Sequence, residues 1–186
     1  MKFLEVEHKF IVSQDFPLDE FKTACRRLRP VREKTVVVQD SYYLPEWSKD
    51  FILRHRQDAE LHQLTVKTRN ADPQVRTEVN LELAAAAEAA QMVTKFMQTI
   101  GTSAPLGIEK TLLVFDFADC EVVHYAASHA GRCIYCVEFE ARQQKDLQSA
   151  YDVLQRYEKA LGFNAQDRCS VNLFDLLIPA QFRNEL

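Results

Sequence analysis

The chain is short of the residues that mark fibrous, low-complexity and membrane-spanning proteins. Its 186 residues contain only 4 glycines and 6 prolines, which excludes a collagen-like or low-complexity chain. No uninterrupted apolar stretch approaches the length of a membrane span. Glu5 and Glu7 follow the N-terminus so closely that we expect no signal or transit peptide there. We therefore expect a protein without a membrane partner.

Excess positive charge and a pattern of paired cysteines are also missing. The net charge of -4 argues against a nucleic-acid partner held by bulk positive charge, although it allows a local basic pocket. The cysteines are odd in number and scattered, which is typical of reduced thiols in a cytoplasmic protein. The chain has no His-Glu-x-x-His, P-loop or Gly-x-Gly-x-x-Gly motif.

The hydrophobic pattern predicts more strands than helices. Helical spacing predicts helices over residues 18–28, 84–100 and 145–161, with Met92, Phe96 and Ile100 as a core stripe of the second. Alternating residues predict strands over 4–12, 35–43, 51–56, 61–68, 74–83, 108–117, 120–127 and 133–141. Residues 170–177 fit either type. Because helices interrupt the strands only occasionally, we predict an α+β fold with one antiparallel sheet, open or closed, and helices outside it. The length and the absence of a linker predict one domain over residues 1–186.

The first predicted strand has charged residues on one face and mainly apolar residues on the other. Glu5, Glu7 and Lys9 alternate with the apolar row, because successive strand side chains point to opposite faces. Similar charged rows recur in later strands, and their members are Arg54, Arg56, Lys67, Arg76, Glu78, Lys110, Glu138 and Glu140. The helices need an apolar surface on which to pack, so the charged rows must face either solvent or an enclosed lumen.

Both alternatives are compatible with the residues alone. In the first, the charged rows are the solvated face of an open sheet. In the second, they line a closed barrel, where lysine and arginine would bind phosphate oxygens and carboxylates would bind a divalent cation. Basic residues and Glu-x-Glu pairs on the same faces are the set that a metal–phosphate complex needs.

The sequence Glu5-Val6-Glu7-His8-Lys9 resembles the Glu-x-Glu-x-Lys signature of the CYTH domain, the family of triphosphate tunnel metalloenzymes. Arg54-His55-Arg56, Lys67, Arg76-Thr77-Glu78, Lys110 and Glu138-Phe139-Glu140 follow in family order. The resemblance implies a closed eight-stranded antiparallel β tunnel with helices packed outside. It also implies Mg²⁺ or Mn²⁺ as the metal and a small-molecule triphosphate as the ligand.

The resemblance also implies a role for each of these residues. The implied metal ligands are Glu5, Glu7, Glu78, Glu138 and Glu140, with Glu82 as a further candidate. The implied triphosphate contacts are Lys9, Arg54, Arg56, Lys67, Arg76 and Lys110. Asp40-Ser41-Tyr42-Tyr43 is similar to the Asp-Thr-Tyr-Tyr segment of thiamine triphosphatases, which implies that Tyr42 works beside Lys67 in catalysis.

Among the positions that depart from the family pattern, three bear on the predicted site. Leu112 stands where the family often has arginine, and the tail has Arg168-Cys169-Ser170 where a lysine is expected. His124 is nearest to the place of a metal-binding aspartate, which Asp116 or Asp119 would fill in another register.

We predict metal-dependent hydrolysis of a small triphosphate, either thiamine triphosphate or inorganic triphosphate. The alternatives are a non-catalytic triphosphate- or polyphosphate-binding module and a class IV-type adenylyl cyclase. A homodimer is compatible with the sequence, since an exposed strand or helix face could pair two copies.

Overall fold

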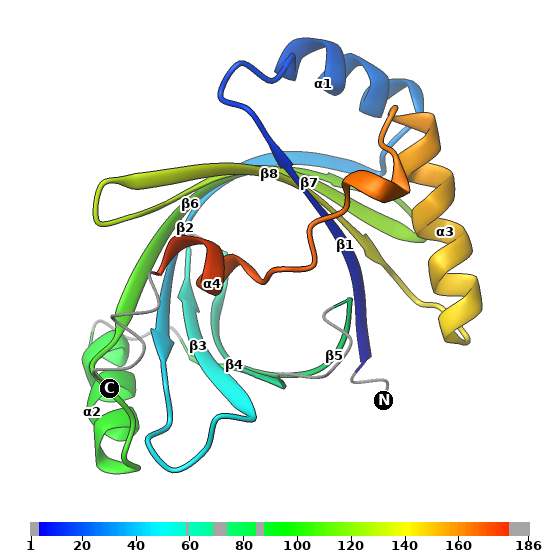
Figure 1. The fold of residues 1–186 in the computed structure, drawn as a ribbon. Helices are drawn as coiled ribbons and strands as arrows, with labels where there is room; N and C mark the ends of the chain where they lie inside the picture. The colour runs from blue at the N-terminus through cyan, green and yellow to red at the C-terminus, as the bar shows by residue number, and fades with distance from the viewer. Residues whose placement is uncertain (1–3, 59, 69–73, 85–87, 179–186) are drawn as a thin grey trace.

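A computed structural model describes residues 4–58, 60–68, 74–84 and 88–178. Across these residues the chain forms eight β-strands closed into a barrel, together with four α-helices (Figure 1). This confirms the expected closed antiparallel tunnel with helices outside it. Within the same residues, no helix combines the length and the apolar character that crossing a membrane requires.

The strands form one antiparallel ring. Their bounds are β1 (Leu4–Val12), β2 (Arg32–Tyr43), β3 (Phe51–Gln57), β4 (His62–Thr68), β5 (Val75–Glu82), β6 (Leu106–Asp116), β7 (Cys120–His129) and β8 (Arg132–Ala141). Their order around the barrel is β1-β5-β4-β3-β2-β6-β7-β8. β1 closes the ring, pairing with β8 along residues 7–12 and with β5 along residues 4–6. This closure leaves one face of every strand inside the barrel.

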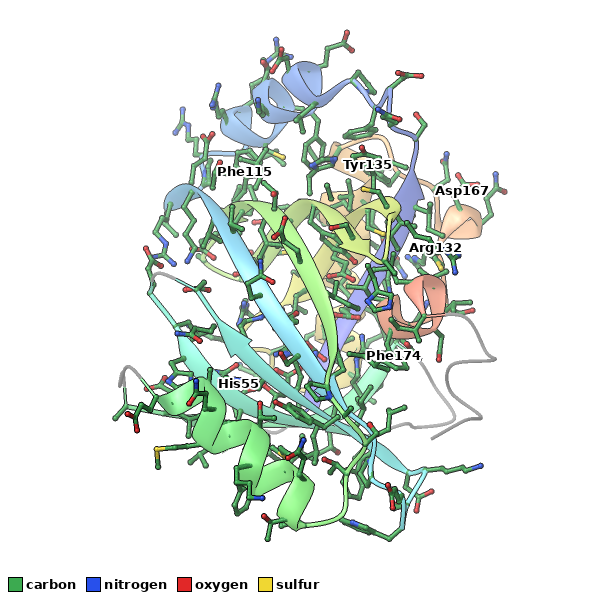
Figure 2. The ribbon with its side chains drawn as sticks, turned by 90° about the vertical axis from the view of Figure 1, so that its left-hand side faces the viewer. His55, Phe115, Arg132, Tyr135, Asp167 and Phe174 are labelled. Atoms are coloured by element: carbon green, nitrogen blue, oxygen red, sulfur yellow. The ribbon has the colours of Figure 1, made fainter. Side chains whose placement is uncertain are left out.

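Two helices cover the outer face of β1, β6, β7 and β8. They are α1 (Leu18–Arg27) and α3 (Leu147–Ala160). Phe21 of α1 and Leu154 of α3 join Phe115 and Phe139 of the barrel in the largest apolar core, and Figure 2 shows Phe115 on the α1 side of the barrel. The Asp146 side chain begins α3, since it accepts a hydrogen bond from the Ser149 amide at 2.8 Å. The main apolar core therefore lies outside the barrel, between sheet and helices.

The third helix, α2 (Ala89–Thr99), packs on the opposite side of the barrel (Figure 1). Residues 85–87 of the predicted helix lie outside the described part of the chain. Met97 is buried against Tyr43 and Leu53, whereas Met92 and Phe96 are 65% and 56% exposed. The predicted core stripe is therefore wrong. The stripe with Phe96 and the stripe with Met97 are both apolar, and it is the one with Met97 that packs against the barrel.

The tail that fitted either helix or strand forms α4 (Leu173–Leu177), which follows a short 3-10 helix over Ala165–Asp167. The Asn172 side chain begins α4 by accepting a hydrogen bond from the Asp175 amide at 2.8 Å. Phe174 and Leu177 are buried in an apolar cluster with Tyr42 and Tyr125. In the view along the barrel, α4 lies over one mouth (Figure 1).

Candidate functional site

The barrel encloses a cavity of about 660 Å³, a volume in the range of small-molecule sites. With the exception of Glu82, the residues to which the sequence gave a binding or catalytic role contribute to its lining. These residues are Glu5, Glu7, Lys9, Tyr42, Arg54, Arg56, Lys67, Arg76, Glu78, Lys110, Glu138 and Glu140. Strand alternation brings them together, because each lies on the inner face of its own strand. The candidate Glu82 is exposed at the end of β5 instead.

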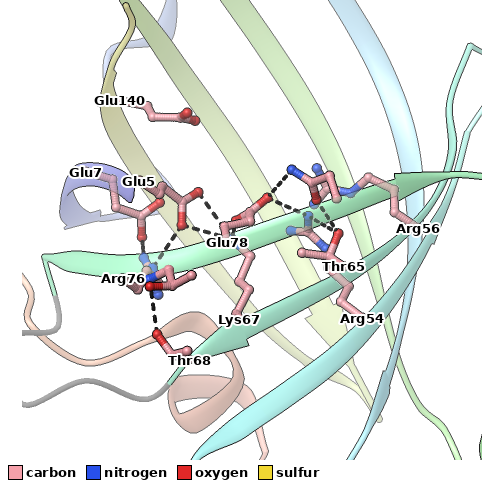
Figure 3. Close-up of polar contacts among 12 residues, drawn as sticks. Glu5, Glu7, Arg54, Arg56, Thr65, Lys67, Thr68, Arg76, Glu78 and Glu140 are labelled. Carbon is pink, nitrogen blue, oxygen red and sulfur yellow. Dashed lines mark hydrogen bonds and ion pairs between the residues drawn. The ribbon is translucent and has the colours of Figure 1, made fainter. Parts of the chain in front are cut away.

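One side of the cavity is a charged wall, formed by the inner residues of β1, β5, β4 and β3. We define it as Glu5, Glu7, Lys9, Arg54, Arg56, Lys67, Arg76 and Glu78. Lys67 lies at its centre, with Nζ 3.2 Å from both carboxylate oxygens of Glu5 and also in an ion pair with Glu78 (Figure 3). Burial opposes the ionisation of Glu78, but Lys67 and Arg54 outweigh it and lower its pKa. The wall is thus an interleaved set of opposite charges.

Two arginines continue this interleaving on either side of Lys67. Arg76 Nε lies 3.0 Å from a Glu5 oxygen, and Arg76 also forms an ion pair with Glu7 (Figure 3). Arg54 donates a hydrogen bond to the Thr65 hydroxyl at 3.1 Å and lies 3.5 Å from Glu78. Each predicted phosphate contact named here is therefore already held by a carboxylate, which fixes its direction into the cavity.

Asp40 is a site residue to which the sequence assigned no role. It accepts two hydrogen bonds from Arg56, each of 2.8 Å, and lies 2.6 Å from Lys110 Nζ. Its side chain has no exposed surface. Burial opposes its ionisation, but Lys110 and Arg56 hold its pKa well below the usual range. The sequence pattern could have indicated Asp40, because it lies two residues before Tyr42 on the same strand and therefore points to the same side of the sheet.

Tyr42 and Lys67, the two predicted catalytic residues, both line the cavity but bond to different neighbours. The Tyr42 hydroxyl lies 3.5 Å from both Asp40 and Lys110 Nζ, and its ring packs against Phe174 of α4. Lys67 bonds to Glu5 and Glu78. Their catalytic roles remain predictions.

A further acidic group lies where β7 and β8 meet. Glu121 of β7 is paired in register with Glu140 of β8, and Arg142 bonds to both, at 2.9 and 3.3 Å. Burial raises the pKa of Glu140, with smaller contributions from the carboxylates of Glu5 and Glu121 and against the opposing effect of Arg142, to about 8. Sequence reasoning missed Glu121 and Arg142, although Arg142 continues the alternation of Glu138 and Glu140.

This acidic region fits a divalent cation by the chemistry of its donors. Carboxylate oxygens are the ligands that Mg²⁺ and Mn²⁺ prefer, and the mutual repulsion around Glu140 is what a cation would relieve. Among the described residues, no three His, Cys, Asp or Glu side chains are already grouped as a metal site. Glu5 and Glu7 pair with Lys67 and Arg76 instead, so an incoming cation would have to displace these basic groups.

The departures from the family pattern lie in three different places. Leu112 lines the cavity, as its alternation with Lys110 requires. His124 points outward and stacks on Phe16 with ring centres 5.6 Å apart, so its expected role as a substitute metal ligand is wrong. Arg168 lies outside the barrel and bonds to Glu158 of α3 at 3.0 Å.

The alternative aspartates do not fill the missing position either. Asp116 bonds to Arg32 at 2.9 Å, and Asp119 accepts a hydrogen bond from Tyr157 at 2.9 Å. Glu121 and Val123 occupy the inner face of β7. His124 is one residue from Val123 and Tyr125, so its side chain points to the other face of the strand.

The opposite side of the cavity is an apolar wall, formed by inner residues of β2, β6 and β7. We define it as Val36, Leu112, Val114, Val123 and Tyr125. In the closed ring, β6 stands opposite β5, and β7 stands opposite β4. The apolar wall therefore faces the charged wall across the cavity.

A closed antiparallel barrel lined by interleaved basic and acidic residues defines the class of the protein, and comparison with known proteins agrees. The CYTH domain matches residues 4–123 of this chain, so the chain belongs to the CYTH domain family. No curated protein matches the chain significantly.

Solved structures resemble the whole barrel. PH1012 protein from Pyrococcus horikoshii OT3 is similar with a TM-score of 0.76 and 14% identity, over 94% of this chain and 99% of that one. HpAC1 from Hippeastrum, whose structure is described as revealing a dominant triphosphatase activity, has a TM-score of 0.61 and 13% identity, over 97% and 96%. A chain of the Schizosaccharomyces pombe Mediator head module has a TM-score of 0.62 and 15% identity, over 86% and 94%. At these identities the likeness shows the fold.

Proposed function

We propose that this protein hydrolyses a small triphosphate inside its barrel, with Mg²⁺ or Mn²⁺ as cofactor. The observation that carries the proposal is the charged wall, where basic side chains point into an enclosed cavity beside the acidic residues of β1 and β8. Phosphate oxygens need several cations around them, and arginine and lysine supply these in a fixed geometry. The triphosphatase activity named for HpAC1 supports the same reaction class.

The basic residues act on charge that develops during the reaction. Arg54, Lys67 and Arg76 would contact phosphate oxygens from the charged wall, and Lys110 would approach from the neighbouring side of the cavity. As water attacks the terminal phosphorus, negative charge spreads over the phosphoryl oxygens and the leaving group. Donors already aimed at these oxygens stabilise that charge without reorganising, and such preorganisation is a large part of catalysis.

The acidic residues would hold the metal. Glu5, Glu7, Glu138 and Glu140 would bind it, with Glu121 close to Glu140. A bound Mg²⁺ would neutralise phosphate charge and fix the oxygens in line. Because Lys67 and Arg76 pair with Glu5 and Glu7 in this structure, binding of the metal and the triphosphate together would release carboxylates to the metal and cations to the phosphates.

Tyr42 and Lys110 form a second group of donors near one mouth of the cavity. Asp40 holds Lys110 at 2.6 Å, and the Tyr42 hydroxyl lies within 3.5 Å of Lys110. Tyr42 would orient or stabilise the leaving group, with Lys67 as the second contributor from the charged wall. This pairing follows the family resemblance of the Asp40-Ser41-Tyr42-Tyr43 segment.

A non-catalytic binding module is the second candidate. The residue that favours it is Leu112, which gives the cavity an apolar side chain beside Lys110 where the family often has a cation. The absence of the tail lysine acts in the same direction, since Arg168 bonds to Glu158 outside the barrel. Fewer cations around the leaving group would slow turnover more than they weaken binding.

One experiment separates these functions. Purified protein is incubated with tripolyphosphate, thiamine triphosphate or ATP, with and without Mg²⁺ or Mn²⁺. Metal-dependent phosphate release supports the proposed hydrolysis. Tight binding without turnover supports the binding module, and cyclic AMP indicates a cyclase.

Two variants test the assignment of the site. Glu7→Gln and Arg56→Ala both alter the charged wall and are expected to lower binding or turnover. Their matched controls are Glu20→Gln and Arg27→Ala, which change exposed residues of α1. If Glu7→Gln and Arg56→Ala behave like their controls, the barrel interior is not the active site.

A further inference from the structure

The apolar wall is continuous across three neighbouring strands. In register, Val36 of β2 is paired with Leu112 of β6, and Leu112 is paired with Tyr125 of β7. One step along the same strands, Val114 is paired with Val123. No charged side chain separates these residues on the inner face. Lys34, Lys110, Glu121 and Glu138 lie at the borders, and Glu138 accepts a hydrogen bond from the Tyr125 hydroxyl at 2.8 Å. The wall is thus one apolar surface.

This surface lies outside the main apolar core, although Tyr125 belongs to the buried cluster with Tyr42 and Phe174, against which Leu112 and Val123 also pack. On β6 and β7 that core is formed by outer-face residues such as Leu113, Phe115 and Val122, which pack beneath the helices. Val36, Leu112 and Val123 are instead only half-buried and line the cavity. An apolar surface left in contact with water inside a polar cavity is a common mark of a ligand site.

A triphosphate alone does not use this surface. Its oxygens need cations and hydrogen-bond donors, which the charged wall supplies and the four aliphatic side chains of the apolar wall cannot. The cavity of about 660 Å³ extends across both walls. At one mouth the apolar lining continues onto α4 through Leu173 and Phe174. The part of the ligand that lies here must be apolar and is suited to a flat ring, because aromatic and aliphatic side chains form the surface.

We propose that the substrate is an organic triphosphate whose ring system packs on the apolar wall while its phosphates bind the charged wall. This rests on the proposed function and narrows it, because inorganic tripolyphosphate has nothing to place against the apolar wall. Val36, Leu112 and Val123 are then specificity residues. They act by removing the ring from water and make no contact with the reacting phosphates.

Isosteric substitutions test this proposal without opening a cavity. The double variant Val36→Thr/Val123→Thr adds two hydroxyl groups to the apolar wall at nearly constant side-chain volume. The matched control is Val37→Thr, because Val37 follows Val36 on β2 but lies on the outer face and is 55% exposed. Thiamine triphosphate, ATP and tripolyphosphate serve as probes. Calorimetry measures the affinity of each variant for each probe, and phosphate release measures kcat/KM.

The quantity to compare is the ratio of the affinities for the organic probes and for tripolyphosphate. The unchanged protein is expected to bind thiamine triphosphate or ATP more tightly than tripolyphosphate, and the preferred probe identifies the ring. In the double variant this preference should fall about tenfold, the size expected from a hydroxyl in an apolar pocket, while tripolyphosphate binding stays constant. Val37→Thr should change neither value. If the double variant does not fold, Val36→Thr alone is measured in its place.

Two results would overturn the proposal. One is a protein that binds tripolyphosphate as tightly as both organic probes. The other is a double variant that weakens all three probes equally. Failure of the proposed hydrolysis would give another result. Phosphate release would then be absent with every probe, while the calorimetric preference for an organic triphosphate remained.

Discussion

The charged wall and the apolar wall face each other across one cavity, yet they are built by different rules. On the charged wall, Lys67, Arg76 and Arg54 each lie beside a carboxylate, so burial of their charges is offset locally. On the apolar wall, Val36, Leu112 and Val123 are half-buried aliphatic side chains that line the open cavity. Without a ligand the charges of the first wall pair with one another, whereas the second wall leaves an apolar surface that a ligand would cover.

This difference shows how a barrel divides the recognition of a mixed ligand. A phosphate chain needs polar surroundings and a ring needs apolar ones. Opposite sides of the interior of one closed sheet can supply both. The strands that contribute the charged wall are contiguous in the ring, and so are those of the apolar wall. The boundary between the walls on β2 contains Asp40, which bonds to Arg56 on one side and Lys110 on the other.

The largest expected effect comes from removing that boundary carboxylate. Asp40→Ala leaves Arg56 and Lys110 as buried cations without their partner, and the free energy of unfolding should fall by about 3–5 kcal/mol. Chemical denaturation measures this change. Asp152→Ala, at an exposed position of α3, is the control and should change stability by less than about 0.5 kcal/mol. Equal denaturation midpoints for Asp40→Ala and the unchanged protein would show that the ion pairs of Asp40 do not stabilise the barrel.

The next effect concerns the centre of the charged wall. Lys67→Ala removes a donor that faces the phosphates and should lower kcat/KM for triphosphate hydrolysis at least about 100-fold. Phosphate release with Mg²⁺ measures it. Lys95→Ala, on the exposed side of α2, should leave the rate unchanged. If the Lys67→Ala variant had normal activity, Lys67 would have no role in catalysis.

A charge placed on the apolar wall should blur the distinction between the two walls. Leu112→Arg adds a cation beside Lys110, so tripolyphosphate should bind more tightly and the preferred organic triphosphate more weakly. The ratio of the two dissociation constants should change about tenfold. Calorimetry measures both constants. Val37→Arg, on the exposed outer face, is the control, and an identical response of the two variants would attribute the effect to general charge.

The smallest effect is a pH dependence of stability at the acidic region. Burial keeps the Glu140 carboxyl protonated in the folded protein up to a pKa of about 8, whereas an unfolded chain releases that proton near pH 4.3. This contribution to stability is therefore complete below about pH 4.3 and is lost as the pH rises through 8.

Glu140→Gln should remove this dependence. At pH 8.5, without divalent cations, the variant should be more stable than the unchanged protein, and the difference should shrink toward pH 5. Thermal unfolding across this range measures it, with Glu20→Gln as the control. A variant that gains no stability at high pH would contradict the raised pKa.

The charged wall could be predicted from the sequence, and the apolar wall could not. Charges such as Glu5, Glu7 and Lys9 stand out in a strand because burial makes them costly, so their alternation draws attention. Val36 and Val123 carry no such signal, because valine is common on either face of a strand. Glu121 was missed because His124 was taken as the nearest match to the family's metal-binding aspartate, whereas His124 lies on the outer face of β7 and Glu121 on the inner face.

The sequence by itself determined the strands, the helices and which charged residues share a face, because local alternation and helical spacing are properties of the chain. Only the tertiary structure decided what those faces meet. Closure of β1 onto β8 and β5 turned the charged rows inward. Contact with the barrel buried Met97 and left Phe96 exposed. The order of strands in the ring placed Leu112 opposite the charged wall. That order depends on contacts between residues far apart in the chain.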